Sequence, residues 1–159
     1  GADILVKGFA DSPLFDWRYV DYCIKLLSEN DADCASNEFT NTFPIGLGAR
    51  AYKFSTLKAA EKNDKDPAYR EHAGYSIRIH TEQFKHAGWE AQGDMRWPEL
   101  RLTLDTLEDY TLITAVFDEL YPKNPDFSAE DVVEFLKTRP DIVAINSEIK
   151  QKVPAIHSS

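Results

Sequence analysis

The chain has 159 residues and is 43% hydrophobic, with 9 Phe, 7 Tyr and 3 Trp, which excludes a disordered polypeptide and suits one domain with a substantial core. Its formal net charge of −9 argues against a general nucleic-acid surface, and a bound polyphosphate would need a metal ion or basic groups beside it. No apolar run is long enough to span a membrane and no signal peptide is visible, while two isolated cysteines favour a reducing cytoplasm over a disulfide scaffold.

The first predicted elements are a buried strand over residues 4–9 and a helix over residues 17–27. Asp16 is expected to cap the helix. Because Pro13 cannot continue a central strand, Asp11 lies just past the strand end. In an α/β sheet this is the edge at which ligands bind.

Two short strands are predicted over residues 34–37 and 49–54, and Ser55 is expected to cap a helix after the second. The loop between them contains Phe43, Pro44 and Gly46. Proline fixes one backbone dihedral and glycine allows positive φ, so such a loop can bring a ligand close to the backbone. An ordinary connection explains the same residues equally well.

A further helix is expected to open at Pro67, followed by a strand over residues 84–92 and a turn over residues 94–98. The helix carries Arg70, Glu71 and His72. Consecutive helix residues point in different directions, so their spacing is not that of a catalytic triad. Arg70 is the best candidate of the three to present a basic group to an anion.

Residues 101–120 are predicted to form a strand that runs directly into a helix. Residues 101–104 alternate in polarity, and Thr106 and Asp109 have the spacing of a capping pair. Asp105 is then on the turn between strand and helix. It is either part of the cap or a ligand for a hard cation such as Mg²⁺.

Residues 122–159 are assigned to a helical extension and tail, separate from an α/β domain over residues 1–121. Prolines break the chain after residue 121, and Ser128 and Asp131 repeat the capping pattern. Ile142, Ile145 and Ile149 indicate one more amphipathic helix. This extension is expected to cover the sheet or to contact a partner.

Motif searches exclude several chemistries. The chain contains no HExxH, GxSxG, GxGxxG or GxxxxGK[ST] pattern, so zinc-protease, esterase and phosphate-loop chemistries are unsupported. What remains is the pair Asp11 and Asp105, each of which follows an apolar strand. If the two strands are neighbours in a parallel sheet, both carboxylates reach one edge and can bind Mg²⁺ together with phosphate oxygens and waters.

Four segments resemble motifs of one family. Ala10–Asp16 is similar to G-D-C-P-L-I-D, Thr42–Leu47 to T-F-P-x-G-L, Asp66–His72 to D-P-x-x-R-E-H, and Leu104–Asp109 to V-D-T-P-E-D. The chain therefore resembles the spore coat polysaccharide biosynthesis type of cytidylyltransferase, related to CMP-KDO synthetase. The segment Ala144-Ile145-Asn146 also resembles extensions seen in that family.

The resemblance implies a nucleotide-diphospho-sugar transferase fold, with a mixed, mainly parallel sheet flanked by helices. It implies that CTP activates a sugar or sugar acid for surface polysaccharide biosynthesis, with release of pyrophosphate. It also implies that Asp11 and Asp105 are catalytic residues that hold Mg²⁺. The substrate-binding residues would be Phe43, Pro44 and Gly46, together with the segment Arg70-Glu71-His72.

Two departures from the family pattern lead to further expectations. The Gly/Arg/Lys-rich loop that grips CTP has no counterpart before Ile4, so the chain resembles the C-terminal part of the family and is expected not to turn over CTP alone. Gly48 and Arg50 stand where the family carries acidic residues, which indicates a changed sugar specificity or lost activity. A non-catalytic binding or assembly module stays open, as does a glycosyltransferase of related fold, although no DxD motif of the usual kind stands at a predicted strand end. A homodimer stays open as well.

Overall fold

The computed structural model describes residues 1–63 and 74–151. Its centre is a four-stranded mixed sheet in the order β1-β3-β2-β4, formed by β1 (Ile4–Lys7), β2 (Cys34–Ser36), β3 (Arg50–Lys53) and β4 (His86–Gly88). β3 pairs antiparallel with both β1 and β2, whereas β2 and β4 are parallel. The expectation of a mixed sheet is confirmed, but "mainly parallel" is wrong for these strands.

The sheet is mixed because the chain turns back after β2 and inserts β3 between β1 and β2. Buried side chains hold this return. The Ser36 hydroxyl donates to the Ala49 carbonyl at 2.9 Å. The Asn37 amide donates to the Leu47 carbonyl at 3.0 Å and accepts from the Ala49 N–H at 2.8 Å.

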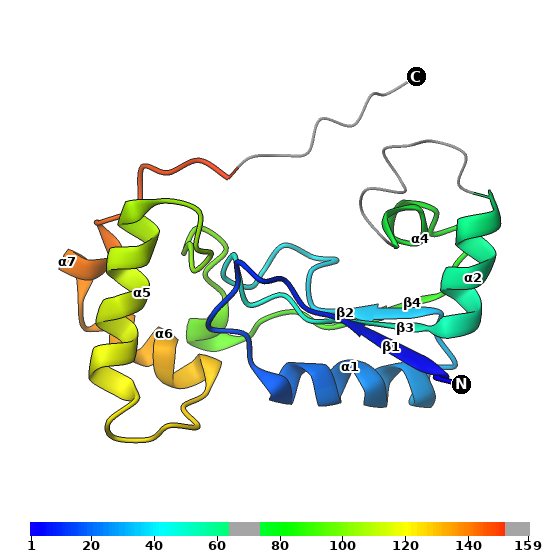
Figure 1. Ribbon diagram of the computed structural model, residues 1–159, viewed down its shortest axis with the longest axis horizontal. Helices are drawn as coiled ribbons and strands as arrows, with labels where there is room; N and C mark the ends of the chain where they lie inside the picture. The colour runs from blue at the N-terminus through cyan, green and yellow to red at the C-terminus, as the bar shows by residue number, and fades with distance from the viewer. Residues whose placement is uncertain (64–73, 152–159) are drawn as a thin grey trace.

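One face of the sheet is covered by α1 (Trp17–Glu29), which lies along the strands in Figure 1. The sheet presents Ala35, Ala51 and Ala87 to this helix as neighbours across three strands. These small side chains let the buried face of α1 approach closely, which builds the main core. The buried α1 residues are Tyr19, Cys23 and Leu27.

A smaller cluster covers the other face, where Cys34 and Tyr52 pack against Ala60 and Ile77. Ala60 belongs to α2 (Phe54–Asn63) and Ile77 to α4 (Tyr75–Ile79). α2 begins one residue before the predicted cap Ser55, because β3 runs into it without a loop. Cys23 and Cys34 are both buried and free, and burial raises the pKa of each thiol to about 12.

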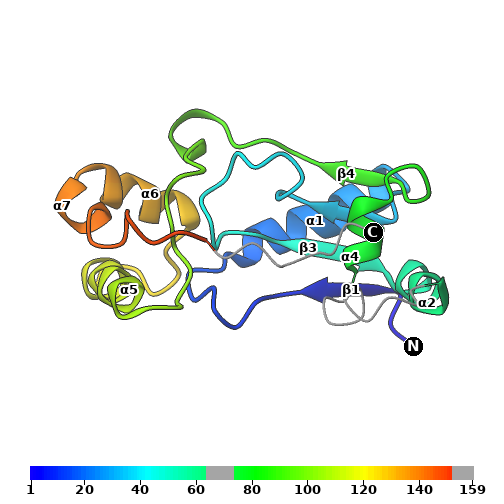
Figure 2. The same ribbon diagram turned by 90° about the horizontal axis from the view of Figure 1, so that it is seen from above.

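The remaining helices gather beyond one end of the sheet, as both views show (Figures 1 and 2). They are α5 (Leu107–Leu120), α6 (Ala129–Lys137) and α7 (Pro140–Val143), with the 3-10 turn η1 (Gly93–Met95) packed on α6. No helix in the described part of the chain is long and apolar enough to cross a membrane.

The helical extension shares the main core of the α/β part, since Ala129 and Val132 belong to the same buried cluster as Leu14 and Tyr19. Asp16 explains this continuity. One of its carboxylate oxygens caps α1 by accepting from the Arg18 N–H at 2.8 Å, and the other accepts from the Ala129 N–H at 2.8 Å at the start of α6. A single buried carboxylate therefore joins two helix N-termini.

Apart from strands that are shorter than predicted, three predicted elements differ from the structure. β1 lies at the edge of the described sheet with Leu5 39% and Val6 38% exposed, so it is not the buried strand that its apolar sequence predicted. Residues 101–104 form only an isolated parallel bridge between Ile45 and Arg101. The long final helix is reduced to α7, because the chain turns at Ala144–Asn146 to bring Asn146 into the interior.

Candidate functional site

Three segments that are distant in the sequence meet just beyond the last residue of β1. The Ile45 N–H donates to the Leu100 carbonyl at 2.8 Å, and the Leu102 N–H donates to the Ile45 carbonyl at 2.7 Å. The next hydrogen bond runs from the Leu104 N–H to the Asp11 carbonyl at 2.8 Å. The turns that carry Asp11 and Asp105 therefore lie side by side at the backbone, through loop contacts and not through neighbouring parallel strands.

Gly46 makes this meeting of segments possible. Its φ is +100°, and a Cβ atom there would lie 2.7 Å from the carbonyl carbon of Leu102 and 2.9 Å from the nitrogen of Thr103. Both are backbone atoms, which cannot move aside cheaply. The glycine of the 42–47 loop is thus explained by close packing of the loop against residues 102–103. Its predicted contact with a substrate stays a prediction.

The Asp105 carboxylate is held by Arg101. Nη2 of Arg101 donates to Oδ2 of Asp105 at 2.6 Å, and the Asp105 side chain remains 46% exposed. Arg101 is itself buried, and its Nε and Nη2 form a two-point ion pair with Asp109, each at 2.9 Å. Asp105 is thus a partly exposed carboxylate with one oxygen fixed by a buried guanidinium.

Asp109 is the centre of this arrangement. The predicted capping box is confirmed, since the Asp109 carboxylate accepts from the Thr106 N–H and the Thr106 hydroxyl accepts from the Asp109 N–H. The same carboxylate accepts from the Asp105 N–H at 3.0 Å and from the Asn146 amide at 2.8 Å. Burial raises the pKa of Asp109, but the hydrogen bonds from Arg101 and Asn146 outweigh it and hold that pKa well below 3.8.

Asp11 has a simpler environment, because it is exposed and the Ser12 hydroxyl lies 3.4 Å from its Oδ1. Two carboxylates with accessible oxygens fit Mg²⁺, which proteins usually hold through one or two carboxylates plus phosphate oxygens and waters. Within residues 1–63 and 74–151, no group of three or more His, Cys, Asp or Glu side chains could hold a metal ion. Asp11 and Asp105 would therefore depend on a substrate for part of the coordination.

The other predicted substrate residues have different surroundings. Phe43 is buried and packs edge-on against Tyr19 and Trp89, with ring centroids 5.5 and 5.7 Å apart. Pro44 is buried as well. Their contacts are those of core residues that shape the loop. Their role toward a substrate stays a prediction, and the segment Arg70-Glu71-His72 lies outside the described residues.

The departure at positions 48 and 50 has a structural explanation. A Cβ at Gly48 would lie 2.4 Å from Cδ of Glu38, so the Glu38 side chain occupies the space that a side chain at position 48 would need. Glu38 also forms an ion pair with the buried Arg50. A carboxylate is therefore present beside position 48, but it comes from the loop after β2.

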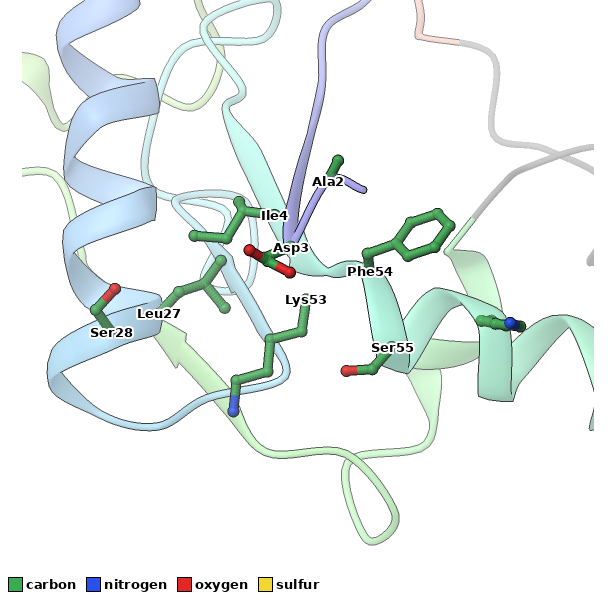
Figure 3. Close-up of a pocket in the computed structure, with 9 residues that line it drawn as sticks. Ala2, Asp3, Ile4, Leu27, Ser28, Lys53, Phe54 and Ser55 are labelled. Carbon is green, nitrogen blue, oxygen red and sulfur yellow. The ribbon is translucent and has the colours of Figure 1, made fainter.

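A cavity of 510 Å³ lies elsewhere. Figure 3 shows it beside the N-terminus, between the last turn of α1 and the start of α2, lined among others by Asp3, Leu27 and Lys53. Its lining includes Ile4, the first residue of β1, whereas the Asp11 turn follows the last residue, Lys7. It is therefore not part of the candidate site.

Sequence analysis missed three groups near the site: Arg101, Asn146 and Thr103. The alternating pattern predicts Arg101 as a polar residue of a strand, and Asn146 enters only through the resemblance of Ala144-Ile145-Asn146 to the family's extensions. Thr103 is 5% exposed, and its hydroxyl has no hydrogen-bond partner among the described residues. A polar residue inside an apolar segment was the available signal for Arg101, but nothing in the sequence pairs residue 101 with residue 146.

Comparisons with known proteins agree with this architecture. A solved structure of a cytidylyltransferase from Leptospira borgpetersenii serovar Hardjo-bovis superposes with a TM-score of 0.82 at 27% identity, covering 95% of this chain and 60% of that one. An uncharacterized protein of Methanocaldococcus jannaschii is 29% identical over 150 residues, which are 94% of this chain and 60% of that protein. The spore coat polysaccharide biosynthesis protein SpsF of Bacillus subtilis is 26% identical over 139 residues, or 87% of this chain and 56% of SpsF.

No protein-family model matches the chain. The chain spans about 60% of the length of the relatives it matches. The mixed α/β fold matches that of a cytidylyltransferase, and the similarities support a cytidylyltransferase-like protein. The particular subfamily and the assignment to its C-terminal part stay predictions.

Proposed function

We propose that the chain forms part of a cytidylyltransferase-like enzyme that activates a sugar or sugar acid with CTP. The observation that supports this proposal is the backbone hydrogen bond from the Leu104 N–H to the Asp11 carbonyl, which joins the turns that carry Asp11 and Asp105. The similarity to the Leptospira cytidylyltransferase and to SpsF supports the reaction class. We also propose that the activated sugar is used in the synthesis of a surface polysaccharide.

In the proposed reaction, a hydroxyl oxygen of the sugar attacks the α-phosphorus of CTP. The bond from that phosphorus to the oxygen bridging to the β-phosphate breaks, pyrophosphate leaves, and the hydroxyl proton passes to a base. Mg²⁺ held by Asp11 and Asp105 would supply positive charge against the triphosphate in a chain whose net charge is −9. Arg101 fixes the Asp105 carboxylate, and the close packing at Gly46 fixes the loop beside it.

Calorimetry of the chain with CTP, CMP-sugars and UDP-sugars, each with and without Mg²⁺, tests the proposal. We expect Mg²⁺-dependent binding of a cytidine nucleotide that is lost in Asp11→Asn and in Asp105→Asn. Asp94→Asn is the matched control, because Asp94 is an exposed carboxylate on η1 paired with Lys137. Binding of none of these ligands would favour an assembly module, and binding of UDP-sugars alone would favour a glycosyltransferase.

Pyrophosphate release tests the remaining expectation about turnover. We expect the chain alone to release no pyrophosphate from CTP with a panel of sugars and sugar acids, since the CTP-gripping loop that the resemblance implies has no counterpart before Ile4. Robust release would contradict this expectation while supporting the reaction class. The homodimer and the cytoplasmic location stay predictions.

A further inference from the structure

The turn that carries Asp105 is tied to a segment far along the chain. Asn146 is 2% exposed, and its amide nitrogen donates to the Arg101 carbonyl at 3.1 Å and to Oδ1 of Asp109 at 2.8 Å. Gln151 accepts a hydrogen bond from Nη1 of Arg101. We refer to Arg101, Asp109 and Asn146 together as the brace.

We infer that Asn146 is a positioning residue for Asp105, so that the C-terminal segment determines how well this carboxylate can hold a divalent cation. The inference rests on the proposed function in one respect, namely that Asp105 is a metal ligand. The contacts that connect the two residues run from Asn146 to Asp109 and Arg101, and from Arg101 to Asp105. Each step is a hydrogen bond or an ion pair.

Every nitrogen of the Arg101 guanidinium has a hydrogen-bond partner. Nε contacts one oxygen of Asp109, Nη2 contacts the other oxygen and Asp105, and Nη1 contacts Gln151. A guanidinium with every nitrogen engaged cannot rotate without breaking several charge-assisted bonds. The Asp105 carboxylate that it contacts is therefore fixed at Oδ2, and among the described residues no hydrogen bond reaches Oδ1.

This geometry favours cation binding through Oδ1. A carboxylate that is 46% exposed would otherwise sample several rotamers, and ordering it would weaken the binding of a metal ion. Groups that hydrogen-bond to a ligating carboxylate tune metal affinity by about 10- to 100-fold in other proteins. Asn146 donates hydrogen bonds to the backbone carbonyl of Arg101 and to Asp109, which binds the Arg101 guanidinium. Removing the Asn146 side chain therefore loosens both the backbone and the side chain of Arg101.

Binding of Mn²⁺ in the presence of CTP, measured by electron paramagnetic resonance on the whole chain, tests the inference directly. We expect Asp105→Asn to abolish the site and Asn146→Ala to raise the dissociation constant by about 10-fold. Gln151→Ala removes only the acceptor for Nη1, is at an exposed position, and should give a smaller loss. Gln151→Ala also provides a test of the inference if Asn146→Ala does not fold.

Two control variants separate positioning from general loss of structure. Asn124→Ala makes the same chemical change in the connection between α5 and α6, where the side chain accepts from the Asp126 N–H. Ser128→Ala removes the capping box of α6 and lowers stability without touching the brace. Both should bind Mn²⁺ as the unchanged chain does.

A second readout does not depend on metal. The ¹³Cγ resonance of Asp105 and the Nε–H resonance of Arg101 should move in Asn146→Ala and stay in place in Asn124→Ala. If Asn146→Ala binds Mn²⁺ normally while Asp105→Asn does not, the inference is overturned. If no Mn²⁺ site depends on Asp105, the proposed metal role of Asp105 fails. If the Asp105 and Arg101 resonances do not shift in Asn146→Ala, that result alone overturns the positioning role of Asn146.

Discussion

The N-termini of α5 and α6 have the same capping motif but different surroundings. In each, a hydroxyl residue caps the helix and an aspartate three residues later returns a hydrogen bond to the cap. Asp131 is partly exposed and bonds only to Ser128 among the described residues. Asp109 is fully buried and also holds Arg101, Asn146 and the backbone of Asp105. A short motif therefore sets where a helix begins, and distant partners decide whether its carboxylate also organises a site.

The largest difference between the two helix starts should come from removing the aspartates. Asp109→Ala leaves Arg101 buried without its main partner, and we expect the free energy of unfolding to fall by about 3–5 kcal/mol. Asp131→Ala removes only a cap contact, and we expect the free energy of unfolding to fall by about 1 kcal/mol. Urea titration of both variants measures the difference. Equal losses would show that Asp109 acts as a cap and nothing more.

Two glycines extend the comparison to the loops that pack near these helices. Gly46→Ala places a Cβ against the backbone of Leu102 and Thr103, in addition to the strain of positive φ. Gly93→Ala, on the turn packed against α6, has φ +54° but meets no atom within 4 Å. We expect the free energy of unfolding to fall by about 1 kcal/mol in Gly93→Ala and by at least twice as much, about 2–4 kcal/mol, in Gly46→Ala. Similar melting temperatures for the two variants would contradict the close packing at residues 102–103.

Acid titration of stability sharpens the contrast between the carboxylates. The pKa of Asp109 in the folded chain is lowered, so its contribution to stability is complete above the ordinary value of 3.8 and is lost as the pH falls below it. Asp109→Asn cannot titrate, and its free energy of unfolding should fall less steeply below pH 3.8 than that of the unchanged chain. Denaturation curves collected at several pH values measure these slopes.

The smallest expected effect concerns Thr103. Its buried hydroxyl has no partner among the described residues, so Thr103→Val removes a desolvated polar group without changing the shape. We expect stability to be unchanged or to rise by about 1 kcal/mol. If this variant binds cytidine nucleotides more weakly but is as stable as the unchanged chain, the Thr103 hydroxyl contacts the ligand. A clear loss of stability would indicate a hydrogen-bond partner within the folded chain.

Local patterns predicted much of the secondary structure correctly. The helix starts at Asp16, Thr106 and Ser128 are all confirmed, because a capping residue acts on N–H groups two or three positions away. The patterns also predict the strands β1, β2, β3 and β4, although all four are shorter than predicted. Apolar periodicity identified these segments because strand and helix spacing are local properties.

Tertiary structure decided what these elements do. Sequence by itself determined that Asp11 and Asp105 each stand on a turn before a helix. Only the folded chain placed Asp11 beside Leu104, pushed β1 to the edge of the described sheet and buried Asn146 against Asp109. Hydrogen bonds between residues 37 or more positions apart depend on the path of the whole chain, and local propensity contains no information about them.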